Sequence, residues 1–178
     1  MEIENSGNPI NDLIEIASQI DVSAESRNAA KEMFQRSDEC GTHINNIINL
    51  LHHPDASISN LAFLTLKTTG TNSVPFLIKE LDNAKGHFRA HLLSLLSIVS
   101  EFKTYYPILK NEFNSHNKTM KFHAANCFGR TYDQVNQEDG NLFLTDCINL
   151  LKSCQNSDSE LEFRTQAVIT LRKLGVMQ

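Results

Sequence analysis

The chain has 178 residues, with 16 lysines and arginines against 21 aspartates and glutamates, a formal net charge of −5 and no tryptophan. A negative chain without a run of basic residues argues against a nucleic-acid partner, whose phosphates need cations, and favours a basic protein partner. The most apolar stretch, residues 92–99, is too short to cross a bilayer, so no membrane partner is predicted.

The N-terminal segment is polar. Residues 1–8 are expected to form a tail, because they lack the basic and apolar regions of a secretory signal. The four cysteines, at positions 40, 127, 147 and 154, show no Cys-x-x-Cys spacing, so we expect reduced thiols and a cytoplasmic protein. An amphipathic helix is predicted from Pro9 to Ile20, where its apolar stripe would cap one end of the fold.

A helix-forming phrase recurs five times at intervals of 30 to 41 residues. Its anchor positions are Arg27, Ser59, Arg89, His123 and Arg164. The positions three and seven after each anchor are apolar in every copy except the fourth, and this spacing puts them on one face of a helix. Self-similarity at such a period predicts a stack of helical hairpins.

A second helix follows each of the first four anchor helices. These second helices are predicted to end at Leu51, Leu81, Phe113 and Leu151, and each carries one apolar stripe that only Lys110 interrupts. The fourth copy is longer, and its residues 133–141 are polar and acidic, which predicts a loop. A loop at this place marks a binding face or reflects tolerated drift.

Two phrases, Ile58-Ser59-Asn60-Leu61-Ala62 and Phe88-Arg89-Ala90-His91-Leu92, and helices such as Val74–Leu81 after them resemble HEAT repeats. The resemblance covers residues 24–175. It implies an all-α fold, a right-handed, armadillo-like α-solenoid of about four to five helical hairpins. We therefore expect a single solenoid domain over residues 9–178. The departures from the motif are Ser59, where HEAT repeats favour arginine, and His123, Asn126 and Arg130 in the fourth copy.

The sequence offers little that resembles a catalytic site. His87 and His91 lie four residues apart on one predicted helix, a spacing that can hold a metal, but no third ligand is suggested and we favour a solvated or packing pair. There is no glycine-rich phosphate loop, no nucleophile elbow and nothing near Cys127 to activate a thiolate. We predict no catalytic residue, no metal and no cofactor, and hence no enzyme.

The HEAT resemblance implies that the second helices line a concave surface that binds the partner. Residues off the buried stripes are then the candidate binding site: Asn46, Asn49, Phe76, Lys79, Glu80, Ile108, Asn111, Glu112, Asp146 and Asn149. The polar members form either a ladder of contacts or an ordinary solvated face. Phe76 and Ile108 either anchor a partner or are covered by neighbouring hairpins. The acidic members would give a negative rim for a cationic ligand.

The resulting hypothesis is a non-catalytic protein-binding module, an inhibitor or immunity-type protein that occludes a basic partner such as a toxin or nuclease. Small size, acidic charge and the missing catalytic groups motivate it. One alternative is a nucleic-acid-processing enzyme like the HEAT-like DNA glycosylases, which would need a basic concave surface. Another is an adaptor subunit with exposed apolar ends. The last helix before Gln178 has no predicted partner helix, which leaves homodimerisation through that end open.

Overall fold

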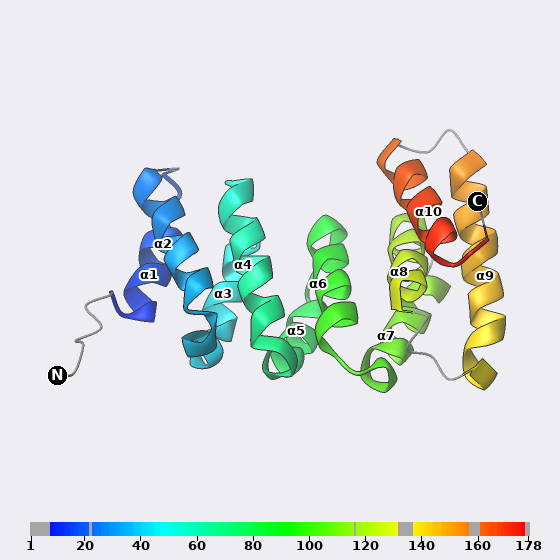
Figure 1. Cartoon of the computed structure of the whole chain (residues 1–178), viewed down its shortest axis with the longest axis horizontal. Helices are drawn as coiled ribbons and strands as arrows, with labels where there is room; N and C mark the ends of the chain where they lie inside the picture. The colour runs from blue at the N-terminus through cyan, green and yellow to red at the C-terminus, as the bar shows by residue number, and fades with distance from the viewer. Residues whose placement is uncertain (1–7, 22, 116, 132–136, 157–160, 177–178) are drawn as a thin grey trace. The chain divides into compact units, whose positions relative to one another are not determined.

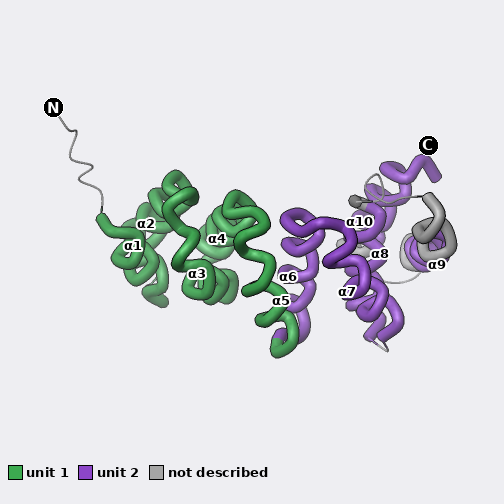
Figure 2. Tube along the Cα trace, turned by 90° about the horizontal axis from the view of Figure 1, so that it is seen from below, with its two compact units in different colours: residues 1–83 green, residues 84–178 purple. Residues whose placement is uncertain are grey.

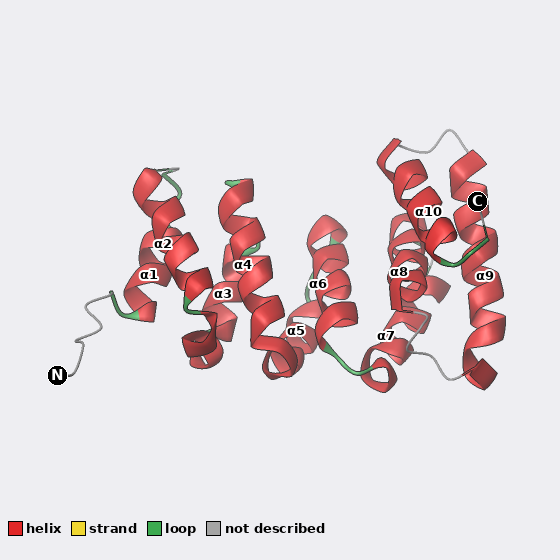
Figure 3. Ribbon diagram, viewed as in Figure 1, coloured by secondary structure: helices red, strands yellow, loops and turns green. Residues whose placement is uncertain are grey.

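The computed structural model describes residues 8–21, 23–115, 117–131, 137–156 and 161–176. Throughout these ranges the regular structure is helical, without a strand, which confirms the all-α prediction (Figure 3). None of the helices described there combines the length and the apolarity that crossing a bilayer requires. The chain divides into two compact units, residues 1–83 and residues 84–178 (Figure 2). This boundary lies inside the segment predicted as one domain, and the single domain stays a prediction.

Unit 1 is built from α-helices in two layers (Figure 1). In chain order its described elements are α1 Ile10–Ala17, α2 Ala24–Gln35, the 3-10 helix η1 Ser37–Thr42, α3 Ile44–Leu50, α4 Ala56–Thr69, the 3-10 helix η2 Gly70–Ser73 and α5 Val74–Leu81. Helix α2 contacts α4 in one layer, whereas α1 contacts α3 and α3 contacts α5 in the other. The pairs α1–α2 and α3–α4 join the layers.

Local signals in the sequence set the helix ends of unit 1. Ser23 caps α2 by accepting a hydrogen bond from the backbone N–H of Ser26 at 3.0 Å, and Asp55 caps α4 in the same way from Ser57 at 2.7 Å. Gly70 ends α4 with a φ of +60°. Between these ends, side chains at helical spacing fill the core of the unit, including Leu13, Met33, Ile44, Ile47, Ile58, Leu66 and Leu77.

Unit 2 contains the longer helices. Its described elements are α6 Gly86–Val99, α7 Phe102–Asn114, α8 Lys118–Thr131, α9 Gln137–Asn156 and α10 Leu161–Lys173. Helix α8 is central, because α6, α7, α9 and α10 all contact it. Helix α10 also packs on α9. Homodimerisation stays a prediction.

The core of unit 2 combines three large aromatic side chains with aliphatic residues. Tyr105, Phe122 and Phe128 are almost completely buried, and they pack with Leu109, Leu151 and other apolar residues in one cluster. The Phe102 ring stacks on Tyr106 with a centroid separation of 4.8 Å and meets Tyr105 edge-on at 5.5 Å. Phe102 and Tyr106 also contact the Phe128 ring of α8, at centroid separations of 6.3 and 6.1 Å, and these contacts hold the start of α7 against α8.

The five predicted anchor helices are confirmed as α2, α4, α6, α8 and α10, and the four second helices as α3, α5, α7 and α9. Three boundaries were wrong. Helix α9, predicted to end at Leu151, continues to Asn156. Residues 137–141 of the expected loop belong to α9, which begins at Gln137; residues 133–136 lie outside the described ranges. Helix α1 ends at Ala17, and Ile20 is 81% exposed beyond it.

The fourth copy departs from the apolar pattern because it contains a buried polar bridge. Asn126 of α8 is only 2% exposed, and its amide nitrogen donates to the side-chain oxygen of Gln166 on α10 at 3.1 Å. Its amide oxygen accepts a hydrogen bond from the hydroxyl group of Thr170. Because both ends of the amide are satisfied, Asn126 is compatible with burial between α8 and α10.

Candidate partner-binding groove

A groove in unit 1 runs between α1 and α3. It has a volume of about 420 Å³ and is lined by Asn11, Ile14, Glu15, Ser18, Asn46 and Asn49. Ile14 is 5% exposed and forms the floor, whereas the polar lining residues are exposed. The groove is therefore an open polar channel with an apolar base.

The apolar periodicity of the two helices determines which side chains reach this groove. Helix α1 buries Ile10, Leu13, Ile14 and Ala17, and helix α3 buries Ile44, Ile47, Ile48 and Leu50. Asn11 and Glu15 share the opposite face of α1 at a spacing of four, and Asn46 and Asn49 share a face of α3 at a spacing of three. Since α1 contacts α3, the two polar faces meet along the groove.

The lining residues can recognise a polypeptide. An asparagine amide presents a carbonyl acceptor and an NH₂ donor, the same pair of functions that a peptide group needs. Glu15 adds a carboxylate, which accepts strong hydrogen bonds from a lysine or arginine side chain. Ser18 is the only hydroxyl in the lining, and it donates to the carbonyl oxygen of Ile14 at 2.6 Å rather than to a base. Binding is therefore the chemistry that the groove supports best.

Predicted site residues of unit 1 lie on α3 and α5. Asn46 and Asn49 are both exposed and line the groove. On α5, Lys79 is exposed, and Phe76 and Glu80 are half-buried. Sequence reasoning missed Asn11, Glu15 and Ser18, because α1 was assigned only the role of an end cap. The polar spacing of Asn11 and Glu15 on one helix face was the signal that would have found them.

The predicted site residues of unit 2 have different surroundings. Asn111, Asp146 and Asn149 are exposed, whereas Ile108 is half-buried and packs against the apolar cluster of the unit. Glu112 is only 4% exposed, and its carboxylate accepts hydrogen bonds from Arg89, at 3.1 Å from Nε. Glu112 therefore holds α7 to α6 and is not part of an exposed acidic rim. A polar ladder that continues through both units stays a prediction.

The negative charge of the chain is concentrated in unit 1. Residues 1–83 contain five basic and twelve acidic residues, a net charge of −7, whereas residues 84–178 contain eleven and nine, a net charge of +2. Two of the cations of unit 1 are already paired, since Arg27 lies 2.7 Å from Asp55 and Arg36 lies 2.7 Å from Glu39. The groove thus lies in the unit whose field attracts cations.

A second, smaller cavity of about 140 Å³ lies in unit 2. The predicted pair His87 and His91 of α6 lines it, together with His123 and Cys127 of α8 and Gln166 of α10. Within the described part of the chain, no group of three or more histidine, cysteine or acidic side chains is placed to hold a metal ion. The proximity of His123 to the α6 pair is a tertiary feature that the sequence spacing did not reveal.

No protein-family model matches the chain, and no curated protein matches it.

Proposed function

We propose that this chain is a non-catalytic protein-binding module whose unit 1 groove takes a basic segment of a partner protein. The observation that carries the proposal is the groove itself, lined by three asparagine amides and one carboxylate in a unit with a net charge of −7. The amides suit a peptide backbone, and the surrounding charge increases the association rate of a cationic partner.

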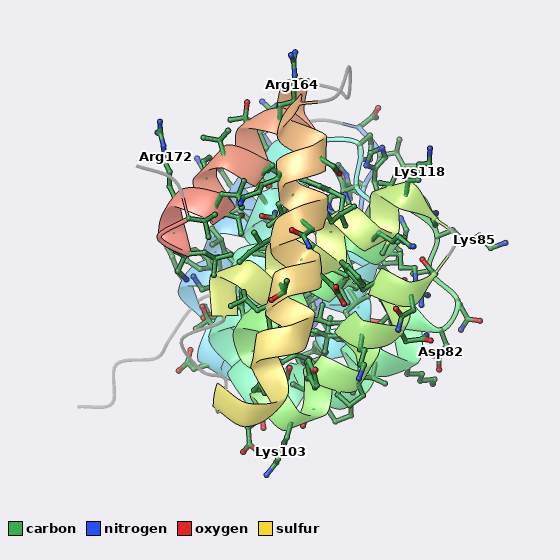
Figure 4. All side chains as sticks on the ribbon, turned by 90° about the vertical axis from the view of Figure 1, so that its right-hand side faces the viewer. Asp82, Lys85, Lys103, Lys118, Arg164 and Arg172 are labelled. Atoms are coloured by element: carbon green, nitrogen blue, oxygen red, sulfur yellow. The ribbon has the colours of Figure 1, made fainter. Side chains whose placement is uncertain are left out.

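The most specific form of the proposal is an inhibitor or immunity-type protein, acting in the cytoplasm by covering a basic toxin or nuclease. Free thiols at Cys40, Cys127 and Cys147 suit a reducing compartment. A nucleic-acid partner is less well supported. The labelled basic side chains of unit 2, Lys85, Lys103, Lys118, Arg164 and Arg172, point outward in different directions rather than forming one basic stripe (Figure 4).

A test of the binding site uses the full chain and a panel of peptides rich in lysine and arginine, with acidic peptides of equal length as negative probes. The double variant Asn46→Ala/Asn49→Ala should weaken binding of the basic peptides at least tenfold. Asn28→Ala/Asn60→Ala removes two exposed amides from α2 and α4, which do not line the groove, and is the matched control. Equal binding by both double variants would overturn the groove as the site.

The inhibitory role has its own test. Basic nucleases are assayed with and without a molar excess of the full chain, and the Asn46→Ala/Asn49→Ala variant is run in parallel. The proposal expects a nuclease that the chain inhibits and the variant does not. Basic-peptide binding without inhibition of any nuclease in the panel would leave a binding module and count against the inhibitor.

We also propose that the helices of both units belong to one right-handed, HEAT-like α-solenoid. Two observations support it: alternate helices contact one another within each unit, and the anchor phrases recur from unit 1 into unit 2. Small-angle X-ray scattering tests the arrangement. A compact globule of this length has a radius of gyration of about 16 Å, so the solenoid requires a clearly larger value. A value near the compact limit would contradict the extended stack.

A further inference from the structure

The outer face of α10 is cationic. Helix α10 packs on α8 and α9, and Ala167 and Leu171 are buried on the packed side. Arg164, Ile169 and Arg172 are exposed on the other side, where Ile169 is 62% exposed. Figure 4 shows both arginines extending away from the helix. An exposed helix face with two guanidinium groups and one apolar side chain is therefore open to a partner.

The outer face of α1 has the opposite charge. Helix α1 packs on α2 and α3 through its apolar stripe, and Asp12 and Glu15 are exposed on the other side. A spacing of three residues places these two carboxylates on the same face of the helix. Ile20 follows the end of α1 and is 81% exposed. This face thus combines negative charge with an adjacent apolar side chain.

The charges of the two helices are complementary. The sequence of α1 contains two acidic residues and no basic one, a net charge of −2. That of α10 contains three basic residues and one acidic residue, Glu162, a net charge of +2; the Glu162 side chain lies outside the described residues. The two α1 carboxylates and the two exposed α10 arginines form no salt bridge with another described side chain. Their charges are therefore available to a second molecule.

The exposed apolar side chains mark the same two helices. Among the described residues, Ile20 and Ile169 are the two most exposed large apolar side chains. Single exposed isoleucines are common on protein surfaces, but each of these two lies beside one of the oppositely charged faces. An apolar contact surrounded by polar and charged groups is the usual composition of a protein–protein interface.

Charge decides which faces can pair between two copies of the chain. Contact between two α10 faces would bring arginines together, and contact between two α1 faces would bring carboxylates together, so like-charge repulsion opposes both arrangements. Contact between α1 and α10 pairs opposite charges instead.

We propose that the outer face of α1 in one copy docks on the outer face of α10 in a second copy, with Ile20 beside Ile169. Such a contact joins two different faces and is heterologous. The proposal does not rest on the groove, because the two helix faces carry it without a bound peptide.

Sedimentation velocity of the full chain tests the contact. The weight-average mass should rise with protein concentration at low salt and fall toward the monomer mass at about 1 M salt, where the Debye length is about 3 Å. A chain that stays monomeric up to millimolar concentration at low salt overturns the proposal. Because no peptide is present, this result is independent of the test of the groove.

Two charge-reversed variants identify the faces. Asp12→Arg/Glu15→Arg makes both faces basic and should weaken association at least tenfold. Arg164→Glu/Arg172→Glu makes both faces acidic and should have the same effect. An equimolar mixture of the two should recover association, since each variant supplies the face that the other lacks. No recovery in the mixture, with both variants folded by thermal unfolding, overturns the pairing of α1 with α10.

A matched control separates the local charges from the net charge. Lys85→Glu/Lys110→Glu changes the charge of unit 2 by the same amount at exposed positions outside α10. It should associate as the unsubstituted chain does. A loss equal to that of Arg164→Glu/Arg172→Glu would mean that net charge governs association, and the α10 face would not be the site.

An uncharged substitution tests the apolar part of the contact. Ile169→Ser should weaken association at least fivefold, and its 62% exposure means that the fold does not depend on it. Ile98→Ser, at a 45% exposed position of α6, is the control and should change nothing. Unchanged association of Ile169→Ser, or an equal loss in Ile98→Ser, overturns the proposed interface.

Discussion

At the residue scale, Gly70 is a position where backbone geometry restricts the sequence directly. Its φ of +60° and ψ of −136° end α4 in a region that side chains with a β-carbon rarely adopt. A β-carbon there would meet no atom within 4 Å, so the cost of Gly70→Ala is conformational. We expect the free energy of unfolding to fall by about 1 to 2 kcal/mol in urea denaturation. Gly41→Ala, equally uncrowded but without a positive φ, is the control and should be nearly neutral; equal losses would contradict this explanation.

The buried thiols give a second prediction at this scale. Burial raises the pKa of Cys40 to about 11. The pKa of Cys147 is also raised above its ordinary value, mainly by burial and to a smaller extent by the nearby Asp146 carboxylate. Only the thiolate is the nucleophile, so a raised pKa lowers the reactive fraction at pH 8. Iodoacetamide should alkylate both residues slowly in the folded protein and completely after unfolding, as peptide mass spectrometry measures. Rapid alkylation of Cys147 in the folded protein would show that its helix opens.

At the element scale, Asp55 connects two anchor helices. Its carboxylate caps α4 and accepts a hydrogen bond from Arg27 of α2 at 2.7 Å. The pKa of Asp55 is held below its ordinary value, mainly by the Arg27 hydrogen bond and next by the Ser57 N–H. A group with a depressed folded pKa stabilises the protein above its ordinary pKa, and this contribution is lost as the pH falls through the folded value. Asp55→Asn should therefore flatten the fall of the thermal midpoint between about pH 6 and about pH 3.

The exposed Asp38 is the control for that experiment. Asp38→Asn should leave the slope of the thermal midpoint against pH close to that of the unsubstituted protein. If Asp55→Asn shows the same slope as Asp38→Asn, the Arg27 contact contributes nothing to the acid sensitivity of unit 1.

The Arg89–Glu112 pair makes the corresponding link in unit 2. The Glu112 side chain is 6% exposed and that of Arg89 is 23% exposed, so removing one charge leaves the other partly desolvated. Glu112→Gln keeps the shape but not the charge and should lower the free energy of unfolding by about 2 kcal/mol, a value below the fully buried case because Arg89 remains partly solvated. Glu101→Gln breaks an exposed pair with Lys103, in which the two side chains are 66% and 82% exposed, and should have no measurable effect in the same urea denaturation.

Helical periodicity explains why the sequence predicted the elements better than their surroundings. Apolar residues at a helical spacing identified the nine anchor and second helices, because each must bury one stripe. Apolar periodicity does not predict the helix over residues 137–141, because the residues that extend α9 there are mostly polar. Nor does it predict the burial of Glu112, whose ion-pair partner Arg89 lies 23 residues away on another helix. Long-range ion pairs depend on how helices pack, which no local pattern encodes.

At the scale of the whole molecule, charge and topology had to be combined to find the candidate groove. The net charge of −5 is the sum of −7 for unit 1 and +2 for unit 2, and this difference becomes visible only when the chain is divided after residue 83. Asn46 and Asn49 were predicted from the repeat, but the groove also needs Asn11 and Glu15 from a helix some thirty residues earlier. The contact between α1 and α3 brings these residues together, and it follows from packing rather than from spacing in the sequence.

This division of charge makes a prediction that separates a local field from the total charge. Glu15→Gln in unit 1 and Glu101→Gln in unit 2 each remove one exposed negative charge and change the net charge equally. If a cationic segment docks in the groove, only Glu15→Gln should reduce the association rate constant of an oligolysine peptide, by about two- to fivefold at low salt. Stopped-flow fluorescence with a labelled peptide measures it, and raising the salt concentration should bring the two variants together because screening removes the long-range attraction. Equal rates for both variants at low salt would mean that the peptide responds to total charge, and the groove would lose its electrostatic support.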